Sequence, residues 1–323
     1  MHTERDAPRT NASTPRPRID LRWPTLRRQF AECAMLPSIA MALPWPLAWR
    51  AMRSLAARGR VFGRETSEAQ AMYNAQGLPP DARSWAQRYR LIRMVDHVDP
   101  AISATRGDRW MDRYVSVDGD AIPPAPCIFI GFHFGTGFWS LRHLRRAGHR
   151  VSFVSAPIDD RQGRAEPLRL ACMRVRQRCV ARAGGAPIIY VGGGGDRIRA
   201  ALANGSSILA LIDVPEPTTS TVDVSVLGRP LRLPDGIVRI GASANVPMVG
   251  YVAALDADTG VRRLHFTRLP SAPTDALHAI AALLDRAIRA DSAAWHFWGQ
   301  WPRFAARPAP SPASASEASS HLR

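Results

Sequence analysis

The chain has 323 residues, of which 46% are hydrophobic, and this is enough for a sizeable core and excludes a wholly disordered protein. Its formal net charge is +16, and every basic residue is an arginine because the sequence contains no lysine. A surface this basic attracts polyanions, such as anionic lipid headgroups, phosphorylated lipids, nucleic acid or an acidic carrier protein. A genomic bias toward arginine codons is the alternative explanation of the composition.

Both ends of the chain are low in complexity. Residues 1–20 are polar and basic, and they lack the apolar stretch of a signal peptide. Residues 306–323 are rich in proline, alanine and serine. We expect both ends to be disordered tails around one continuous body.

Residues 21–113 are predicted to be mostly helical, with a break at 77–80. Within this region, residues 33–49 are uncharged and are flanked by arginines. Three prolines and a length below the roughly 20 residues of a membrane span favour an interfacial hairpin or amphipathic segment. Trp45 and Trp49 would suit the headgroup layer. The alternative is an ordinary helical hairpin that packs on the core.

From residue 114 to 305 short apolar runs alternate with longer amphipathic stretches, which predicts an α/β fold with a central mixed sheet flanked by helices. The expected strands are 127–132, 151–155, 187–191, 207–212, 222–226, 230–233, 246–253 and 263–267. The expected helices are 136–147, with Thr136 as its N-cap, and 166–183, 196–203, 236–244 and 274–290.

The four cysteines form no C-x-x-C pair and show no metal-ligand spacing; they are Cys33, Cys127, Cys172 and Cys179. We therefore expect reduced thiols in the cytoplasm and no metal or other cofactor.

One segment carries the pattern of an active centre. An apolar strand runs into His133, and a glycine-rich turn with Gly135 and Gly137 follows before the next helix. The carboxyl ends of strands are where α/β proteins place their ligands. A neutral imidazole there can take a proton from a hydroxyl that attacks a thioester. The alternative is a histidine that only packs or caps at the strand end.

Several blocks in order resemble the lipid A lauroyl/myristoyl acyltransferases of the lysophospholipid acyltransferase superfamily, over roughly residues 30–305. The blocks are His133-Phe134-Gly135, the segment 201–214 ending in Asp213 and Val214, Leu227-Gly228-Arg229-Pro230 with Pro234-Asp235-Gly236, Asn245-Val246-Pro247, and the tryptophan-rich segment 295–304.

The resemblance implies a glycerolipid acyltransferase-like fold at the cytoplasmic face of a bacterial inner membrane, peripheral or monotopic. It implies transfer of a fatty acyl group from acyl carrier protein or acyl-CoA to a hydroxyl of a lipid or glycolipid, with His133 as general base. A homologue that binds lipid or acyl carrier without catalysis is the alternative. Nucleic-acid binding would rest on charge alone, and we expect no nucleic-acid partner.

The resemblance also suggests roles for other residues. The backbone of Gly135 and Thr136 would line the oxyanion site, and Asp213 would orient His133 or contact substrate. The remaining expected substrate contacts are Arg142, Glu216 and Arg229. Arginines on helices 136–147 and 166–183 would dock a phosphate-bearing acceptor or an acidic carrier, or form a solvated face. Trp295, Trp298 and Trp301 would pack in the core, or alternatively wall an acyl chain or anchor the protein at a membrane interface.

The sequence departs from the family at one position. The family carries an acid five residues after the histidine, where this chain has Phe138. Loss of such an orienting acid costs about four orders of magnitude in serine-protease triads. Three explanations stay open: Asp213 or Glu216 takes over the role, the histidine works slowly alone, or the protein binds without turnover. Asp213 itself also fits a simple turn former after a strand.

Overall fold

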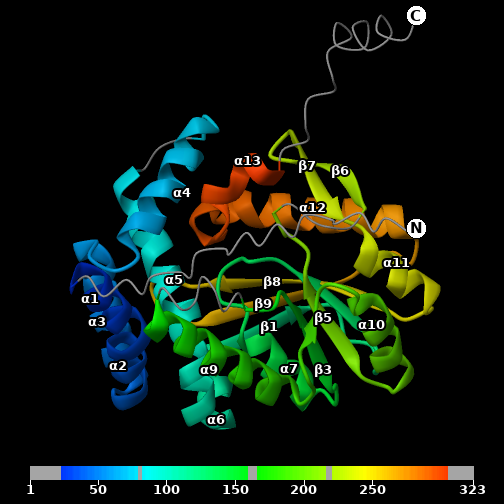
Figure 1. Cartoon of the computed structure of the whole chain (residues 1–323), viewed down its shortest axis with the longest axis horizontal. Helices are drawn as coiled ribbons and strands as arrows, with labels where there is room; N and C mark the ends of the chain where they lie inside the picture. Colours follow the sequence, from blue (N-terminus) through cyan, green and yellow to red (C-terminus); the bar gives the residue numbers. More distant parts are fainter. Residues whose placement is uncertain (1–22, 79–81, 159–165, 216–219, 305–323) are drawn as a thin grey trace, which may run out of the picture.

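A computed structural model describes residues 23–78, 82–158, 166–215 and 220–304 of the chain (Figure 1). The two predicted tails, 1–20 and 306–323, lie outside the described residues, and so does Glu216.

The centre of the fold is a mixed seven-stranded sheet in the order β1-β9-β8-β2-β5-β3-β4, which confirms the predicted fold class. Its strands are β1 (Val115–Gly119), β2 (Ile128–Gly131), β3 (Val151–Ser155), β4 (Ile189–Tyr190), β5 (Ser207–Leu211), β8 (Met248–Leu255) and β9 (Arg262–Arg268). β8, β2, β5, β3 and β4 are mutually parallel, whereas β9 pairs antiparallel with β8 and parallel with β1. The central strand β2 is buried along its whole length, as expected of a parallel strand covered on both faces.

Helices cover both faces of the sheet (Figure 1). α12 (Pro273–Ala290) lies above it in this view, and α7 (Trp139–Arg146) and α9 (Pro167–Gly184) lie below it. α6 (Asp108–Tyr114), α10 (Gly194–Ala203) and α11 (Gly236–Ser243) complete the layers. α7 begins three residues later than predicted, with Phe138 at its N-cap, so the expected capping by Thr136 is wrong. Thr136 is instead fully buried.

The N-terminal region is helical, as predicted. It comprises α1 (Trp23–Phe30), the π-helical turn η1 (Ala31–Met35), α2 (Leu36–Ala42), α3 (Trp45–Arg58), α4 (Gly63–Ala75) and α5 (Ala82–Thr105). Trp45 and Trp49 are buried and belong to the same hydrophobic core as the sheet, so their expected place in a headgroup layer is wrong. Segment 33–49 is thus a helical hairpin packed on the core. None of the helices that the structure describes combines the length and apolarity needed to cross a membrane.

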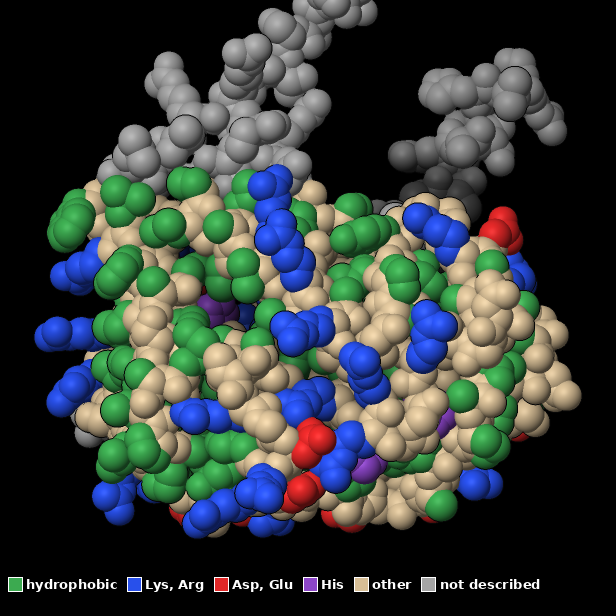
Figure 2. Space-filling view, turned by 90° about the horizontal axis from the view of Figure 1, so that it is seen from below, with side chains coloured by type: hydrophobic (Ala, Val, Ile, Leu, Met, Phe, Trp, Pro, Cys, Tyr) green, Lys and Arg blue, Asp and Glu red, His purple; other side chains and the backbone are tan. Residues whose placement is uncertain are grey.

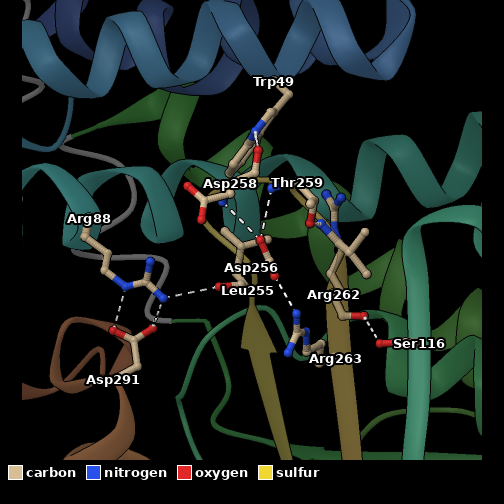
Figure 3. A network of polar contacts seen from close by, with 11 residues as sticks. Trp49, Arg88, Ser116, Leu255, Asp256, Asp258, Thr259, Arg262, Arg263 and Asp291 are labelled. Carbon is tan, nitrogen blue, oxygen red and sulfur yellow. Dashed lines mark hydrogen bonds and ion pairs between the residues drawn. The ribbon is translucent and has the colours of Figure 1, made fainter.

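Polar contacts fasten the N-terminal helices to the β8–β9 turn (Figure 3). The Trp49 indole Nε1 donates to the backbone oxygen of Asp258 at 3.2 Å. Arg262, at the start of β9, is fully buried, forms an ion pair with buried Asp99 of α5, and lies 4.1 Å from the ring of Trp45. The N-terminal region and the sheet therefore form one packed body.

The remaining elements are a two-stranded hairpin and the C-terminal turns. β6 (Thr221–Val226) and β7 (Arg229–Pro234) pair antiparallel, as predicted, around a turn in which Leu227 and Gly228 both have positive φ. η2 (Ser292–Ala294), η3 (Trp298–Gln300) and α13 (Trp301–Phe304) end the described chain. Trp295, Trp298 and Trp301 are buried against one another, which is the core-packing alternative.

Candidate active site

Strand register brings His133 and Asp213 together. β2 and β5 are parallel neighbours, and Gly131 at the end of β2 is paired with Leu211 at the end of β5. His133 and Asp213 each follow two residues later, so both leave the same carboxyl edge of the sheet side by side. The sequence predicted the site at this edge of the sheet. Although Phe138 replaces the acid of the resembling family, another carboxylate, that of Asp213, reaches His133.

Asp213 holds His133 at two points. Its Oδ1 accepts a hydrogen bond of 2.9 Å from the His133 ring nitrogen Nδ1. The backbone N–H of His133 also donates to Oδ1 and Oδ2, at 2.9 and 3.0 Å. The Asp213 side chain is 1% exposed and that of His133 35% exposed. The carboxylate thus fixes both the backbone and the ring of His133, and it leaves Nε2 as the nitrogen available for chemistry.

The C-terminal segment completes the site. The Trp295 indole Nε1 donates to Asp213 Oδ2 at 2.9 Å, and Trp295 forms an isolated antiparallel bridge with Phe134. The next residue, His296, donates its backbone N–H to the carbonyl of His133 at 2.9 Å. The His133 turn is therefore held between β5 and a segment more than 160 positions later in the chain.

The His296 side chain is a structural element of the turn. Its Nε2 donates to the carbonyl of Gly135 at 2.9 Å, and Nδ1 accepts from Arg93 at 2.9 Å. Burial, with the nearby Arg93 cation, lowers the pKa of His296 to about 3. A neutral ring with one donor and one acceptor satisfies both contacts.

A cavity of about 330 Å³ opens beside His133, within the usual size range of small-ligand pockets. Its walls come from the ends of β2, β3 and β5 and from α7 and α9. Most of the lining is apolar, with Phe132, Phe138, Leu141, Phe153, Met173, Val180, Leu209 and Leu211. Trp295, Trp298 and Trp301 are not among its lining residues, so their alternative role as an acyl-chain wall is wrong.

An ion pair forms part of the polar lining of the cavity. Arg176 of α9 contacts the carboxylate of Asp96 on α5 at 3.1 Å and the Asp96 carbonyl at 2.9 Å. Burial opposes ionisation of this carboxyl, but the Arg176 guanidinium outweighs it and holds the pKa of Asp96 below its usual value. The cavity wall therefore contains a positively charged Arg176 and a negatively charged Asp96 that are held in place by each other.

Phe138 stands where the resembling family has its acid. It is 5% exposed, lines the cavity and precedes α7. Its side chain therefore contributes apolar wall, while Asp213 carries the carboxylate contact to the imidazole.

The expected oxyanion donors are already occupied. The amide of Gly135 donates to the carbonyl of Ala294 at 2.8 Å, and that of Thr136 donates to Ala253 at 3.1 Å. Gly135 has φ +59°, and a Cβ there would lie 1.7 Å from the Ala253 oxygen, so glycine permits close approach of strand β8 rather than of a ligand. The prediction that these two amides bind an oxyanion is wrong.

The other expected substrate contacts lie away from His133. Arg142 donates to the carbonyls of Ser103 and Arg106 and to Asp108, with a side chain 17% exposed. Arg229 is exposed on β7, and it does not line the cavity. Neither residue lines the His133 cavity, whereas Arg142 lines a neighbouring groove, so contact of either residue with substrate stays a prediction.

A separate groove carries many of the arginines predicted on the two helices. It has a volume of about 740 Å³ between α5, α7 and α9, and shares Phe138 with the His133 cavity. Its basic lining consists of Arg106, Arg142, Arg145, Arg146, Arg178 and Arg182. Figure 2 shows this side of the molecule, with arginines spread across it and few acidic side chains.

Sequence reasoning missed the roles of Trp295 and His296. Their position in a block similar to the family's terminal segment was the only available signal, because no local spacing relates them to His133. The chain matches no protein-family model, and a search of curated protein sequences found no match.

Proposed function

We propose that the protein is an acyltransferase that moves a fatty acyl group from a thioester to a hydroxyl of a lipid or glycolipid. The observation that carries this is the pair of buried Asp213 and partly exposed His133 beside a largely apolar cavity. An orienting carboxylate behind a partly exposed imidazole is the arrangement expected of a general base. The apolar walls suit an acyl chain.

The reaction follows from the free nitrogen of His133. Nε2 takes the proton of the acceptor hydroxyl as its oxygen attacks the thioester carbonyl carbon. The tetrahedral intermediate then collapses, the C–S bond breaks, and the imidazolium returns the proton to the departing thiolate. Asp213 keeps Nδ1 protonated and stabilises the imidazolium. One ester and one thiol are formed without net proton release.

Stabilisation of the tetrahedral oxyanion requires donors other than Gly135 and Thr136. The amides of Gly137 and Phe138 border the cavity just before α7, and within the described part of the chain no backbone oxygen accepts from them. They are the donors we propose, since backbone amides before a helix suit a developing negative charge.

The donor would be acyl carrier protein or acyl-CoA, and the acceptor a membrane lipid. The arginine-lined groove beside the cavity offers guanidinium groups for the phosphates of either. We further propose peripheral or monotopic association with the cytoplasmic face of a bacterial inner membrane. Trp23 and Phe30 on α1 are 73% and 58% exposed beside Arg27, and Leu47 is 48% exposed beside Arg50. Exposed apolar side chains with flanking arginines favour binding to an anionic lipid surface.

Lipid mass spectrometry on cells tests the proposal. The gene is deleted and then restored as wild type, as His133→Ala, or as His278→Ala. His278 is an exposed histidine on α12 outside the cavity, so it is the matched control. We expect deletion to remove one class of acylated lipid, and the wild type and His278→Ala to restore it.

His133→Ala should fail to restore that lipid, because loss of a general base lowers the rate by about 10²–10⁴-fold. Full restoration by His133→Ala would refute the general-base role and favour a protein that binds lipid or carrier without turnover. An unchanged lipid profile after deletion would refute acyl transfer itself.

A further inference from the structure

A second cluster of reactive side chains lies among the N-terminal helices and α9. Cys33 comes from the π-helical turn η1, His97 from α5 and Cys172 from α9. The two sulfur atoms and one ring nitrogen all lie within 4.8 Å of one another. Each ligand belongs to a different helix, so the absence of metal-ligand spacing in the sequence could not exclude a metal here.

The spacing of these atoms fits a tetrahedral metal ion. Cys172 Sγ and His97 Nε2 are 3.6 Å apart. Zinc with a Zn–S distance of about 2.3 Å and a Zn–N distance of about 2.0–2.1 Å places two such ligands roughly 3.5–3.6 Å apart. The thiols of Cys33 and Cys172 are also close enough to share a hydrogen bond. The Cys172–His97 pair is therefore already at the separation that a tetrahedral zinc ion requires, and the sulfur of Cys33 lies within 4.8 Å of both atoms.

A buried polar group without a hydrogen-bond partner in the described part of the chain lies beside the cluster. Next to Cys33 lies Glu32, whose side chain is buried with its Oε1 lacking a hydrogen-bond partner within the described residues. A cation at the cluster would offset the negative charge of this carboxyl.

We propose that Cys33, His97 and Cys172 bind one zinc ion, with a water molecule as the fourth ligand. Two thiolates balance the charge of Zn²⁺, and a neutral imidazole completes a protein ligand set known in zinc proteins. Cys33 lies on a π-helical turn, and such turns are frequent at functional sites.

The ion would fasten the N-terminal helices to the wall of the catalytic cavity. The chain neighbours of two ligands, Asp96 and Met173, both line that cavity. Loss of zinc would therefore loosen η1 from α5 and α9, while the Asp213–His133 pair lies on other elements.

Metal analysis of the full chain, purified without a polyhistidine tag under reducing conditions, tests the proposal. We expect about one zinc per chain by mass spectrometry, as one Cys₂His site predicts, and thiolate-to-metal charge-transfer absorption after replacement by Co²⁺. Loss of a residue that only hydrogen-bonds a metal ligand lowers metal affinity by about 10–100-fold. Cys33→Ser and Cys172→Ser each remove a ligand itself, so each should lower zinc affinity by more than this. A chelator should lower the Tm of the wild type but not of these variants.

Cys179→Ser is the matched control, since this thiol is on the same helix as Cys172 but outside the cluster. It should keep the zinc, the absorption band and the response to chelator. A wild type that neither contains zinc nor develops the cobalt band would overturn the proposal. So would a Cys33–Cys172 disulfide found by thiol trapping in intact cells, because it would make the pair a redox site instead.

Discussion

Replacing Asp213 by asparagine removes one oxygen from a carboxylate that accepts from three N–H groups. If the amide NH₂ of the new asparagine faces Trp295, it meets the indole N–H, and two hydrogen-bond donors then face each other without an acceptor. If it faces His133 instead, Nδ1 must become the acceptor, and Nε2 then carries the hydrogen and can no longer take a proton. Either orientation leaves the site with one contact broken, and the second also gives the wrong tautomer.

The expected loss in kcat is about 10⁴-fold, the effect of the same change in a serine-protease triad. That corresponds to roughly 5.5 kcal/mol in activation free energy. KM should be unchanged, because Asp213 does not line the cavity. The unpaired buried donor should lower the free energy of unfolding by about 1–3 kcal/mol. Release of thiol from an acyl thioester in the presence of extracted lipid measures the rate, and urea titration measures stability.

Asp285→Asn is the control for this change. Asp285 on α12 also accepts from a backbone amide, that of Leu227 at 2.6 Å, and pairs with Arg289 away from the cavity. It should reduce stability without changing kcat. A folded Asp213→Asn protein that retained more than about one tenth of wild-type kcat would refute the orienting role, because general-base effects start at about 10²-fold.

Three other changes have defined outcomes. Phe138→Glu introduces an acid at the position where the resembling family has one. It should lower kcat and Tm, because it buries a charge in an apolar wall while the histidine already has its carboxylate. A rise in kcat would contradict this. His296 has a pKa of about 3 in the folded protein and near 6.5 in the unfolded chain. Between these pH values the unfolded chain binds more protons than the folded protein. The free energy of unfolding should therefore fall as the pH falls, by at most about 1.4 kcal/mol per pH unit. Urea titration at pH 7 and 5.5 should show a smaller fall in His296→Gln, and equal falls would contradict this. Asp99→Asn should lower the free energy of unfolding, measured by urea titration, by about 3–5 kcal/mol, because it leaves Arg262 buried without a counter-charge. The double variant Asp99→Asn with Arg262→Met should recover part of that loss. No recovery in the double variant would contradict this.

Local patterns predicted most of the sheet and the position of the site. β3 was predicted with its exact limits because its apolar run is bounded by clear breaks. Asp213 was singled out mainly because segment 201–214 resembles a segment of the acyltransferase family. β1 was missed because only Val115 among its residues is buried, so no alternation marks it. Thr136 was read as a cap from residue type alone, whereas packing against Ala253 of β8 decides its place. Contacts between distant segments, such as Trp295 with Asp213, leave no periodic signal in a single sequence.

The order in which the chain is made gives the C-terminal segment a further consequence. His133 and Asp213 leave the ribosome well before Trp295 and His296, which tie down the turn between them. A nascent chain that already contains every strand of the sheet therefore still lacks the contacts of Trp295 and His296 that hold the His133 turn. Under the proposed function, activity would begin only after synthesis has passed this segment, and an incomplete chain would not consume acyl donor.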